Sequence, residues 1–511
     1  METLHLGAQP LTLEDIFQVA VNQKQVDLSA QARAKIQAAH EFLKSRLLTG
    51  ETYYGVNTGF GLLSHVRISS ADLESLQHNL LRSHACGVGA ALPDAAVRAM
   101  LVLRAASLSI GHSGVSLQLV EQILLLLNRG VIPVVPEQGS VGASGDLAPL
   151  SHLALPLIGE GRARFRGQEM SGAQALKAAG IQPIRLGPKE GLALINGTQF
   201  MAALGTLHLL KAERLADLAD LIGAMSVEAL RGTPAAFDPA IHRVRPHPGQ
   251  AQVAENVLKW LTPRGQRSEI GKSHEDCNRV QDPYSLRCIP QVHGASRDIL
   301  TFVRQVLERE VNSVTDNPLI FPEEGKILNG GNFHGQILAN AMDMLSIAAA
   351  ELASISEQRL EKLVNPATSG LPAFLTVQGG LNSGFMIVQV TAASLVSENK
   401  TLCHPASVDS IPTSADKEDH VSMGAWAARK AGMVIANSQR VLSLELLAAA
   451  QGVDLLRPLR STEPLEKVHH MIRRRIKRLD GDRPFSEDFG AVLEMMNSDE
   501  MLQIIQSVSS N

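Results

Sequence analysis

The sequence predicts an all-α fold, with a long central helical bundle and a smaller, more irregular N-terminal domain that carries an Ala-Ser-Gly loop. Three observations support this prediction. A stretch without glycine or proline runs from Ile337 to Val364, other long apolar segments follow the same pattern, and strand-like runs are short and few. The 511 residues, of which 45% are hydrophobic and 19% charged, can bury a large core and exclude a disordered chain.

The stretch from Ile337 to Val364 shows the clearest helical pattern. Its apolar residues recur at alternating steps of three and four, as in the seam of a helical bundle: Leu338, Ala341, Leu345, Ala348, Leu352 and Ile355. Asn365-Pro366 predicts the end of this helix. We expect further helices over residues 191–230, 295–314 and about 414–450, and a short strand at 163–166.

Glycine-rich turns distinguish the first part of the chain from the rest. They lie at residues 55–61, 87–89 and 139–145. We therefore place one boundary near Gly197. Residues 1–197 are expected to form a mostly helical N-terminal domain with the Ala-Ser-Gly loop, and residues 198–511 the long-helix bundle and a C-terminal helical region.

Charge and composition exclude several classes of function. A net charge of −4 gives no general attraction to nucleic acid or to an anionic membrane. The longest uncharged stretch, residues 363–397, is interrupted by proline, glycine and amide residues, and the N-terminus lacks the pattern of a secretory signal. We expect a cytoplasmic protein whose cysteines, none in a CxxC pair, are reduced: Cys86, Cys277, Cys288 and Cys403.

Sequence motifs for external cofactors are lacking. Residues 265–273 resemble a phosphate-binding loop, but five residues separate Gly265 from Gly271 where four are required. No HExxH zinc motif occurs, and the basic run 473–478 is best interpreted as a solvated helix face. We therefore expect no metal and no pyridoxal or nucleotide cofactor.

The segment Gly139–Leu150 carries the chemistry. Its simplest interpretation is a turn leading into a helix, with Asp146 as the N-cap. A tight turn also lets the amide nitrogen of Gly145 attack the carbonyl carbon of Ala143, because both residues are small. Loss of one water on cyclisation, and of a second from Ser144, would give a methylidene-imidazolone, an electrophile that no ordinary side chain provides.

The Ala-Ser-Gly triplet with the following Asp-Leu-Ala-Pro-Leu resembles the self-processed prosthetic group of the aromatic amino acid ammonia-lyases. Six further blocks resemble that family in the same order along the chain: residues 54–61, 82–89, 194–199, 280–288, 330–335 and 418–423. One position is less typical, because Lys417 stands where many members have glutamine.

The resemblance implies the reaction. Members that act on L-histidine are the nearest, so we expect elimination of ammonia to give trans-urocanate. A tyrosine or phenylalanine ammonia-lyase, or an aminomutase with the same group, is the alternative. A fumarase-like helical lyase or an inactive scaffold is the remote one, although the intact triplet argues against it.

The resemblance also assigns the catalytic roles. Ala143, Ser144 and Gly145 would form 4-methylidene-imidazol-5-one, without an external cofactor. Tyr54, on a glycine-rich loop, would remove the β-proton. Two further catalytic residues are implied, Tyr284 to assist and Glu418 beside the substrate ring.

The implied substrate-binding residues match the parts of histidine. Arg287 would bind the carboxylate bidentately, and the amides of Asn196 and Gln281 would contact the prosthetic group or the substrate. Phe333 would line the pocket. Ser83 and His84 occupy the place of a selectivity pair whose second position is apolar in phenylalanine and tyrosine lyases; with Glu418, they offer polar partners to an imidazole.

The family is further expected to form a homotetramer. Its long helices would pack into a shared bundle, and each active site would draw residues from three chains.

Overall fold

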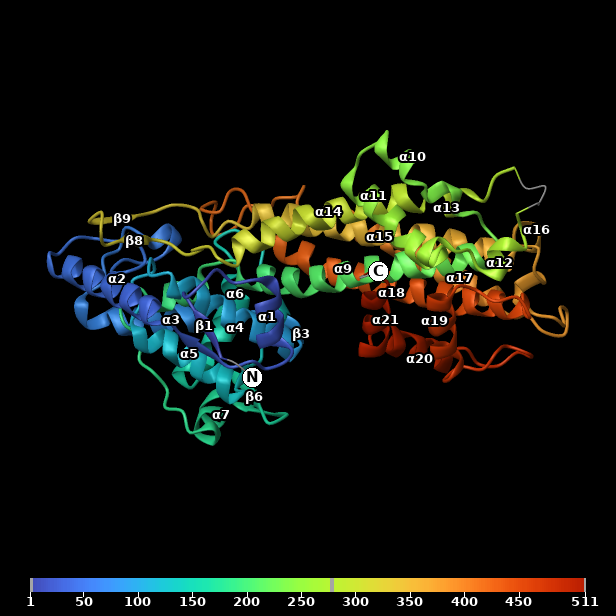
Figure 1. The fold of residues 1–511 in the computed structure, drawn as a ribbon. Helices are drawn as coiled ribbons and strands as arrows, with labels where there is room; N and C mark the ends of the chain where they lie inside the picture. Colours follow the sequence, from blue (N-terminus) through green and yellow to red (C-terminus); the bar gives the residue numbers. More distant parts are fainter. Residues whose placement is uncertain (1–2, 276–279, 510–511) are drawn as a thin grey trace. The chain divides into compact units, whose positions relative to one another are not determined.

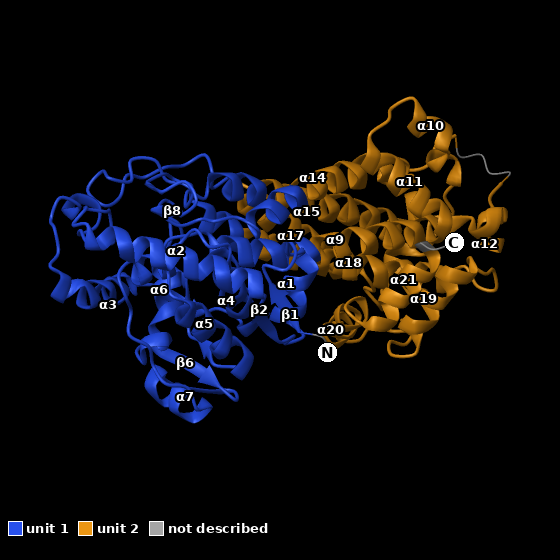
Figure 2. Cartoon of the chain, turned by 60° about the vertical axis from the view of Figure 1, so that its left-hand side comes forward, with its two compact units in different colours: residues 1–210, 303–343, 405–429 blue, residues 211–302, 344–404, 430–511 orange. Residues whose placement is uncertain are grey.

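The computed structural model describes residues 3–275 and 280–509, which form two compact units (Figures 1 and 2). Unit 1 comprises residues 1–210, 303–343 and 405–429, and unit 2 comprises the remaining segments. Four long helices contribute residues to both units: α9 (Gln199–Ala229), α14 (Ile289–Glu310), α15 (Gln336–Val364) and α18 (Gly424–Leu455). This division differs from the single boundary expected near Gly197, because the chain returns twice to unit 1 along these helices.

Unit 1 contains shorter helices and small sheets. Its helices are α1 (Leu13–Ala20), α2 (Ala30–Leu48), α3 (Leu73–His84), α4 (Asp94–Ser109), α5 (Leu117–Arg129), α6 (Leu147–Ala154), α7 (Gly172–Ala179) and α8 (Glu190–Ile195). The sheets are β1 (Leu4–Leu6) with β2 (Val26–Leu28), which are parallel, and three antiparallel sets: β3 (Val88–Ala91) with β5 (Pro136–Gln138), β4 (Ile132–Pro133) with β6 (Arg162–Phe165) and β7 (Gln168–Ser171), and β8 (Leu319–Phe321) with β9 (Lys326–Leu328).

Unit 2 is a bundle of long helices. Its parts of α9, α14, α15 and α18 lie side by side with α17 (Met386–Leu402) in both views (Figures 1 and 2). Buried hydroxyls cross-link them: Ser296 on α14 donates to the carbonyl of Ala348 on α15, and Ser438 on α18 to that of Ala349. The remaining helices are α10 (Pro239–Arg243), α11 (Pro248–Leu261), α12 (Glu269–Lys272), α13 (Tyr284–Arg287), α16 (Pro366–Ser369), α19 (Glu463–Arg473), α20 (Ser486–Met496) and α21 (Asp499–Ser509).

The mostly helical fold and the predicted seam are confirmed. All six seam residues of α15 are buried, and the helix ends at Val364, before Asn365-Pro366. By length and composition α15 could cross a membrane, but 61% of its most apolar window is buried inside the chain, as in the core helix of a soluble protein. Within the described residues, Cys86, Cys288 and Cys403 form no disulfide, and Cys277 lies outside that part of the chain.

Two helical predictions need correction. The helix expected from about Ser414 begins only at Gly424, because Ser414, Ala415 and Asp416 have φ angles of 53°, 53° and 60°, in the left-handed region that a right-handed helix excludes. The segment expected at 191–230 is divided into α8 and α9 by a turn at residues 196–198. Both interruptions carry site residues.

Candidate active site

The Ala-Ser-Gly loop docks onto the turn between α8 and α9. Gly145 pairs with Gly197, and the amide of Asp146 donates to the carbonyl of Gly197 at 2.7 Å. Gly145 has a φ of +78°, and a Cβ there would overlap the backbone of Gly197. Only glycine therefore permits this close approach of two backbones.

Asp146 connects the loop to the start of α9 by hydrogen bonds. It stands at the N-cap position of α6 but makes no side-chain cap, contrary to expectation. Its buried carboxylate instead accepts hydrogen bonds from the amides of Phe200 and Met201, in the first turn of α9, and from the Ser140 hydroxyl. Burial raises the pKa of Asp146 to about 7, although these three hydrogen bonds oppose the shift.

Ser144 is held at both of its oxygens. Its hydroxyl donates to the carboxylate of Glu418, and its carbonyl accepts a 2.7 Å hydrogen bond from the side-chain amide of Asn196. Asn196 is buried at the end of α8, so its amide has a fixed position. The structure thus brings together three of the residues that the sequence assigned to the site.

Glu418 is presented by the left-handed turn of residues 414–416. The hydroxyls of Thr413 and Ser414 both donate to its carboxylate, at 2.6 and 3.0 Å. Burial alone would raise the pKa of Glu418, but the hydrogen bonds from Ser144, Thr413 and Ser414 outweigh it and bring the pKa below its usual value. The carboxylate is therefore ionised at neutral pH. Thr413 and Ser414 were not assigned by sequence, although two hydroxyl residues just before a candidate carboxylate are a usable signal.

His84 is the last residue of α3. Its Nδ1 lies 2.9 Å from the carbonyl of Leu80, one turn back, and the adjacent Ser83 hydroxyl donates to the same carbonyl. This arrangement assigns the proton to Nδ1 and leaves Nε2 as an acceptor. Burial lowers the pKa of His84, against the opposing effects of the Leu80 carbonyl and the Glu418 carboxylate, so the imidazole is neutral at pH 7.

Tyr54 lies in the glycine-rich loop before α3. Its ring packs edge-on against Phe60, with 6.4 Å between centroids, and its hydroxyl accepts a hydrogen bond from the amide of Gly61 at 3.3 Å. The neighbouring Tyr53 is occupied elsewhere: its hydroxyl donates to Glu51, and burial and that carboxylate raise its pKa to about 12.

One cavity of about 1350 Å³ in unit 1 collects most of the predicted residues. Apolar side chains such as Leu80, Leu192 and Ile195 form part of its wall. The sequence-assigned residues that line it are Tyr54, Ser83, His84, Ala143, Ser144, Asn196, Phe333 and Glu418. Lys417, the atypical position, lines it as well. Apolar walls with a few convergent polar groups are typical of a small-molecule site.

Four assigned residues do not line this cavity. One is Gly145, which packs against the backbone of Gly197, and the other three are Gln281, Tyr284 and Arg287. These three belong to unit 2. Tyr284 is 72% exposed, and a hydrogen bond with the Cys288 thiol raises its pKa. The Arg287 guanidinium lies 5.3 Å from the centre of the Tyr284 ring and donates through Nε to the backbone carbonyl of Asp282. Among the described residues, no carboxylate forms an ion pair with it.

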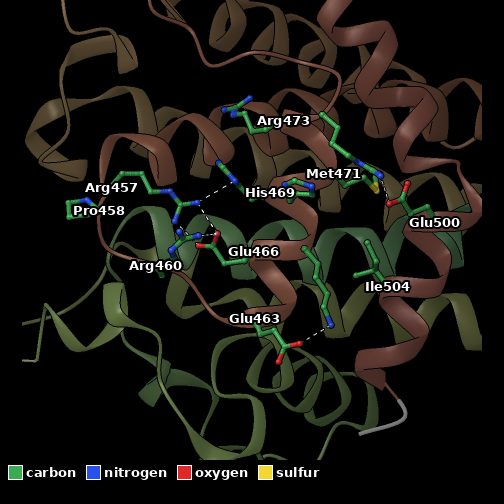
Figure 3. A pocket seen from close by; sticks show the side chains of 13 residues that line it. Arg457, Pro458, Arg460, Glu463, Glu466, His469, Met471, Arg473, Glu500 and Ile504 are labelled. Atoms are coloured by element: carbon green, nitrogen blue, oxygen red, sulfur yellow. Dashed lines mark hydrogen bonds and ion pairs between the residues drawn. The ribbon is translucent and has the colours of Figure 1, made fainter.

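A second cavity, of about 900 Å³ in unit 2, is a weaker candidate (Figure 3). It lies beside α19 and α21, and its cationic side chains are paired with carboxylates: Arg457 with Glu466, Lys467 with Glu463, Arg473 with Asp454 and Arg474 with Glu500. Arg475 and Arg478 form further ion pairs with Glu494 and Asp480. The expectation of a helix face over residues 473–478 is wrong, because α19 ends at Arg473. Among the described residues, no group of three or more His, Cys, Asp or Glu side chains is placed to hold a metal ion.

Comparison with known proteins points to one group of enzymes. A family model described as aromatic amino acid lyase matches residues 11–474. A histidine ammonia-lyase of Anaeromyxobacter dehalogenans (strain 2CP-C) is 54% identical over 97% of this chain and 99% of its own, and that of Myxococcus xanthus (strain DK1622) is 52% identical over 99% of both.

Solved structures agree with the sequence matches. The crystal structure of histidine ammonia-lyase from Trypanosoma cruzi superposes with a TM-score of 0.92, at 45% identity over 99% of this chain and 96% of that one. A tyrosine aminomutase from Streptomyces globisporus gives a TM-score of 0.93 at 37% identity over 99% of both chains.

Proposed function

The chain belongs to the aromatic amino acid lyase family, and we propose that it eliminates ammonia from L-histidine to give trans-urocanate. The observation that carries the proposal is the meeting of His84 and Glu418 in the cavity that contains Ser144. The identity of about half the residues with histidine ammonia-lyases over nearly the full length supports the same substrate.

Members of this family carry 4-methylidene-imidazol-5-one, and we propose that Ala143, Ser144 and Gly145 form it here. The residues fit this group. Ala143 is small, Gly145 approaches Gly197 where no side chain has room, and Asn196 donates to the Ser144 carbonyl oxygen, which would become the exocyclic carbonyl oxygen of the imidazolone. The group supplies an electrophile for the amine or the ring of the substrate. Asn196 makes it more electrophilic by stabilising negative charge on that oxygen.

His84 and Glu418 are proposed to bind the imidazole ring of the substrate through hydrogen bonds. Both present acceptors, Nε2 of His84 and the ionised carboxylate of Glu418. An imidazole that carries positive charge has an N–H on each nitrogen and satisfies both, whereas a phenyl ring satisfies neither. Positive charge on the ring also makes the neighbouring Cβ–H more acidic.

Removal of the β-proton is assigned to Tyr54, with Tyr284 assisting. Tyr54 lines the cavity on a glycine-rich loop, and the amide of Gly61 donates to its oxygen, where negative charge would be stabilised. Arg287 is assigned to the substrate carboxylate, which it can bind through two parallel hydrogen bonds, and Gln281 to a neighbouring amide contact.

The substrate assignment is tested by comparing three amino acids. We expect kcat/KM for urocanate formation from histidine to exceed that for cinnamate formation from phenylalanine by a factor on the order of 10⁴, because the apolar ring offers no N–H donor to His84 or to Glu418. The measurement is the initial rate for histidine, tyrosine and phenylalanine with the same preparation. Faster turnover of either of the latter two, or a β-amino acid as the product, would overturn this assignment in favour of the alternatives.

We also propose that the enzyme is a homotetramer with active sites shared between chains. Two observations support this: Gln281, Tyr284 and Arg287 do not line the cavity that holds Ser144, and apolar side chains of the unit 2 helices are exposed. The exposed residues are Met344, Ile347, Met386, Ile387, Val390 and Met433. Such surface is typically covered by another chain.

Complementation tests the shared site. Tyr54→Phe and Arg287→Met are each expected to be nearly inactive. Chains of both variants assembled together should regain about a quarter of wild-type activity, since that fraction of sites would receive both native residues from different chains. If each site is built from one chain, every site keeps a lesion and no activity returns. Light scattering on the same samples gives the oligomeric mass, and a monomeric active enzyme would contradict the proposal.

The family consists of soluble enzymes, and we propose a cytoplasmic location for this one. Cys86, Cys288 and Cys403 form no disulfide in the part of the chain that the structure describes, which is consistent with a reducing compartment.

A further inference from the structure

Arg104 is a buried cation that contacts the turn at residues 196–198, on which the Ala-Ser-Gly loop docks. It lies on α4 in unit 1 and is 1% exposed. Its Nη1 donates to the backbone carbonyl of Asn196 at 2.8 Å, while Nε and Nη2 have no hydrogen-bond partner among the described residues. A guanidinium buried with so few partners is costly, so an apolar residue would serve packing better.

The buried carboxylate of Asp316 interacts electrostatically with Arg104 but is hydrogen-bonded to another cation. Asp316 is hydrogen-bonded to the ammonium group of Lys189 at 2.7 Å, and both side chains are fully buried. Asp316 Oδ1 has no partner among the described residues. Burial lowers the pKa of Arg104 to about 10, and Asp316 opposes this shift. Arg104 is therefore charged at neutral pH.

Arg104 is linked to the reacting loop through one turn of chain. The backbone oxygen of Asn196 accepts from Arg104, and the side chain of the same Asn196 donates to the Ser144 carbonyl. The next residue, Gly197, pairs with Gly145, and a Cβ at Gly197 would lie 2.6 Å from Arg104 Nη1. Both contacts of the turn with the loop thus depend on a segment that the guanidinium supports.

We propose that Arg104 is a positioning residue that holds the Asn196–Gly197 turn so that the Asn196 amide stays on the Ser144 carbonyl. This inference rests on the proposed function, because the Ser144 carbonyl matters only if the loop becomes the electrophile. The guanidinium contacts this turn through the backbone carbonyl of Asn196. Its loss should therefore slow both cyclisation and turnover, without touching the substrate.

Arg98 offers a matched control on the same helix. It is 5% exposed and donates through Nε to the carbonyl of Val19 and through Nη1 to that of Leu127, at 3.0 and 3.1 Å. It is thus a buried arginine bonded to backbone oxygens, like Arg104, but it has no contact with the Asn196–Gly197 turn.

The experiment compares Arg104→Met with Arg98→Met. For Arg104→Met we expect kcat to fall about 10–100-fold with little change in KM, as when a supporting residue behind a functional group is removed. Intact-protein mass should show a smaller fraction of cyclised chain, whereas Arg98→Met should match wild type in both. Arg104→Lys, which keeps one charged donor, should recover part of the cyclised fraction, and it serves as the test if Arg104→Met does not fold.

A double-mutant cycle with Asn196→Ala distinguishes an effect of Arg104 on the position of the Asn196 amide from an effect on the stability of the fold. If Arg104 acts through Asn196, Arg104→Met should lower kcat much less in the Asn196→Ala background than in wild type. Additive losses, or equal losses of cyclised mass in Arg98→Met and Arg104→Met, would overturn the inference alone. A wild-type chain that shows no mass loss would overturn both this inference and the proposed function.

Discussion

Ser144→Ala is expected to reduce the turnover of histidine to background while leaving the chain folded. Alanine lacks the hydroxyl that must leave as water to form the methylidene carbon, so no electrophile can form. Glu418 loses one hydrogen bond but keeps those from Thr413 and Ser414, and the free energy of unfolding should fall by only about 1 kcal/mol. Urocanate formation and the circular dichroism spectrum are measured on the same preparation.

Ser151→Ala is the matched control for this substitution. Ser151 is fully buried on α6, in the same segment of chain, and its hydroxyl donates to the carbonyl of Leu147 at 2.8 Å. It should cost similar stability and leave activity near that of wild type. A Ser144→Ala chain that retains most of its activity would refute the mechanism.

His84→Leu should have the second largest effect on the turnover of histidine, because it changes which substrate ring the site accepts. We expect kcat/KM for histidine to fall by orders of magnitude, because leucine removes one of the two polar partners of the imidazole and leaves the ring facing an apolar group. Cyclisation should be unaffected, since Ser144 is held by hydrogen bonds with Glu418 and Asn196. The measurements are steady-state kinetics with histidine and phenylalanine, together with intact mass.

His65→Leu provides the control. The Nδ1 atom of His65, like that of His84, lies close to a preceding backbone carbonyl, here that of Leu62 at 3.0 Å, but His65 does not line the cavity. Its replacement should leave the kinetics unchanged. Unchanged kinetics in His84→Leu itself would remove His84 from the substrate site.

The helical architecture could be predicted from local patterns. The seam of α15 follows from apolar spacing, and its end at Val364 follows from the nearby Pro366; both signals act within a few residues. The start of α18 could not be predicted in this way. The hydroxyls of Thr413 and Ser414, at the left-handed turn of residues 414–416, donate to Glu418. Residues 413–423 contain no proline or glycine that would predict this turn.

The candidate site was predictable where a residue acts by its own chemistry. Ser144, Asn196, His84 and Glu418 meet in one cavity, as the motif blocks led us to expect. Arg104 could not be found from sequence, because it acts through a backbone carbonyl some ninety positions away and lies in an ordinary apolar helix. For Gln281, Tyr284 and Arg287, the shared-site assignment stays a prediction.

The mass of the intact, purified wild-type chain tests the central claim most directly. If Ala143, Ser144 and Gly145 form the methylidene-imidazolone, the chain weighs less than its sequence by the mass of two water molecules, and a proteolytic fragment spanning Gly139–Leu150 carries the whole difference. The Ser144→Ala chain cannot lose the second water. A wild-type mass equal to that of the unmodified sequence, in a preparation that forms urocanate, would contradict the account.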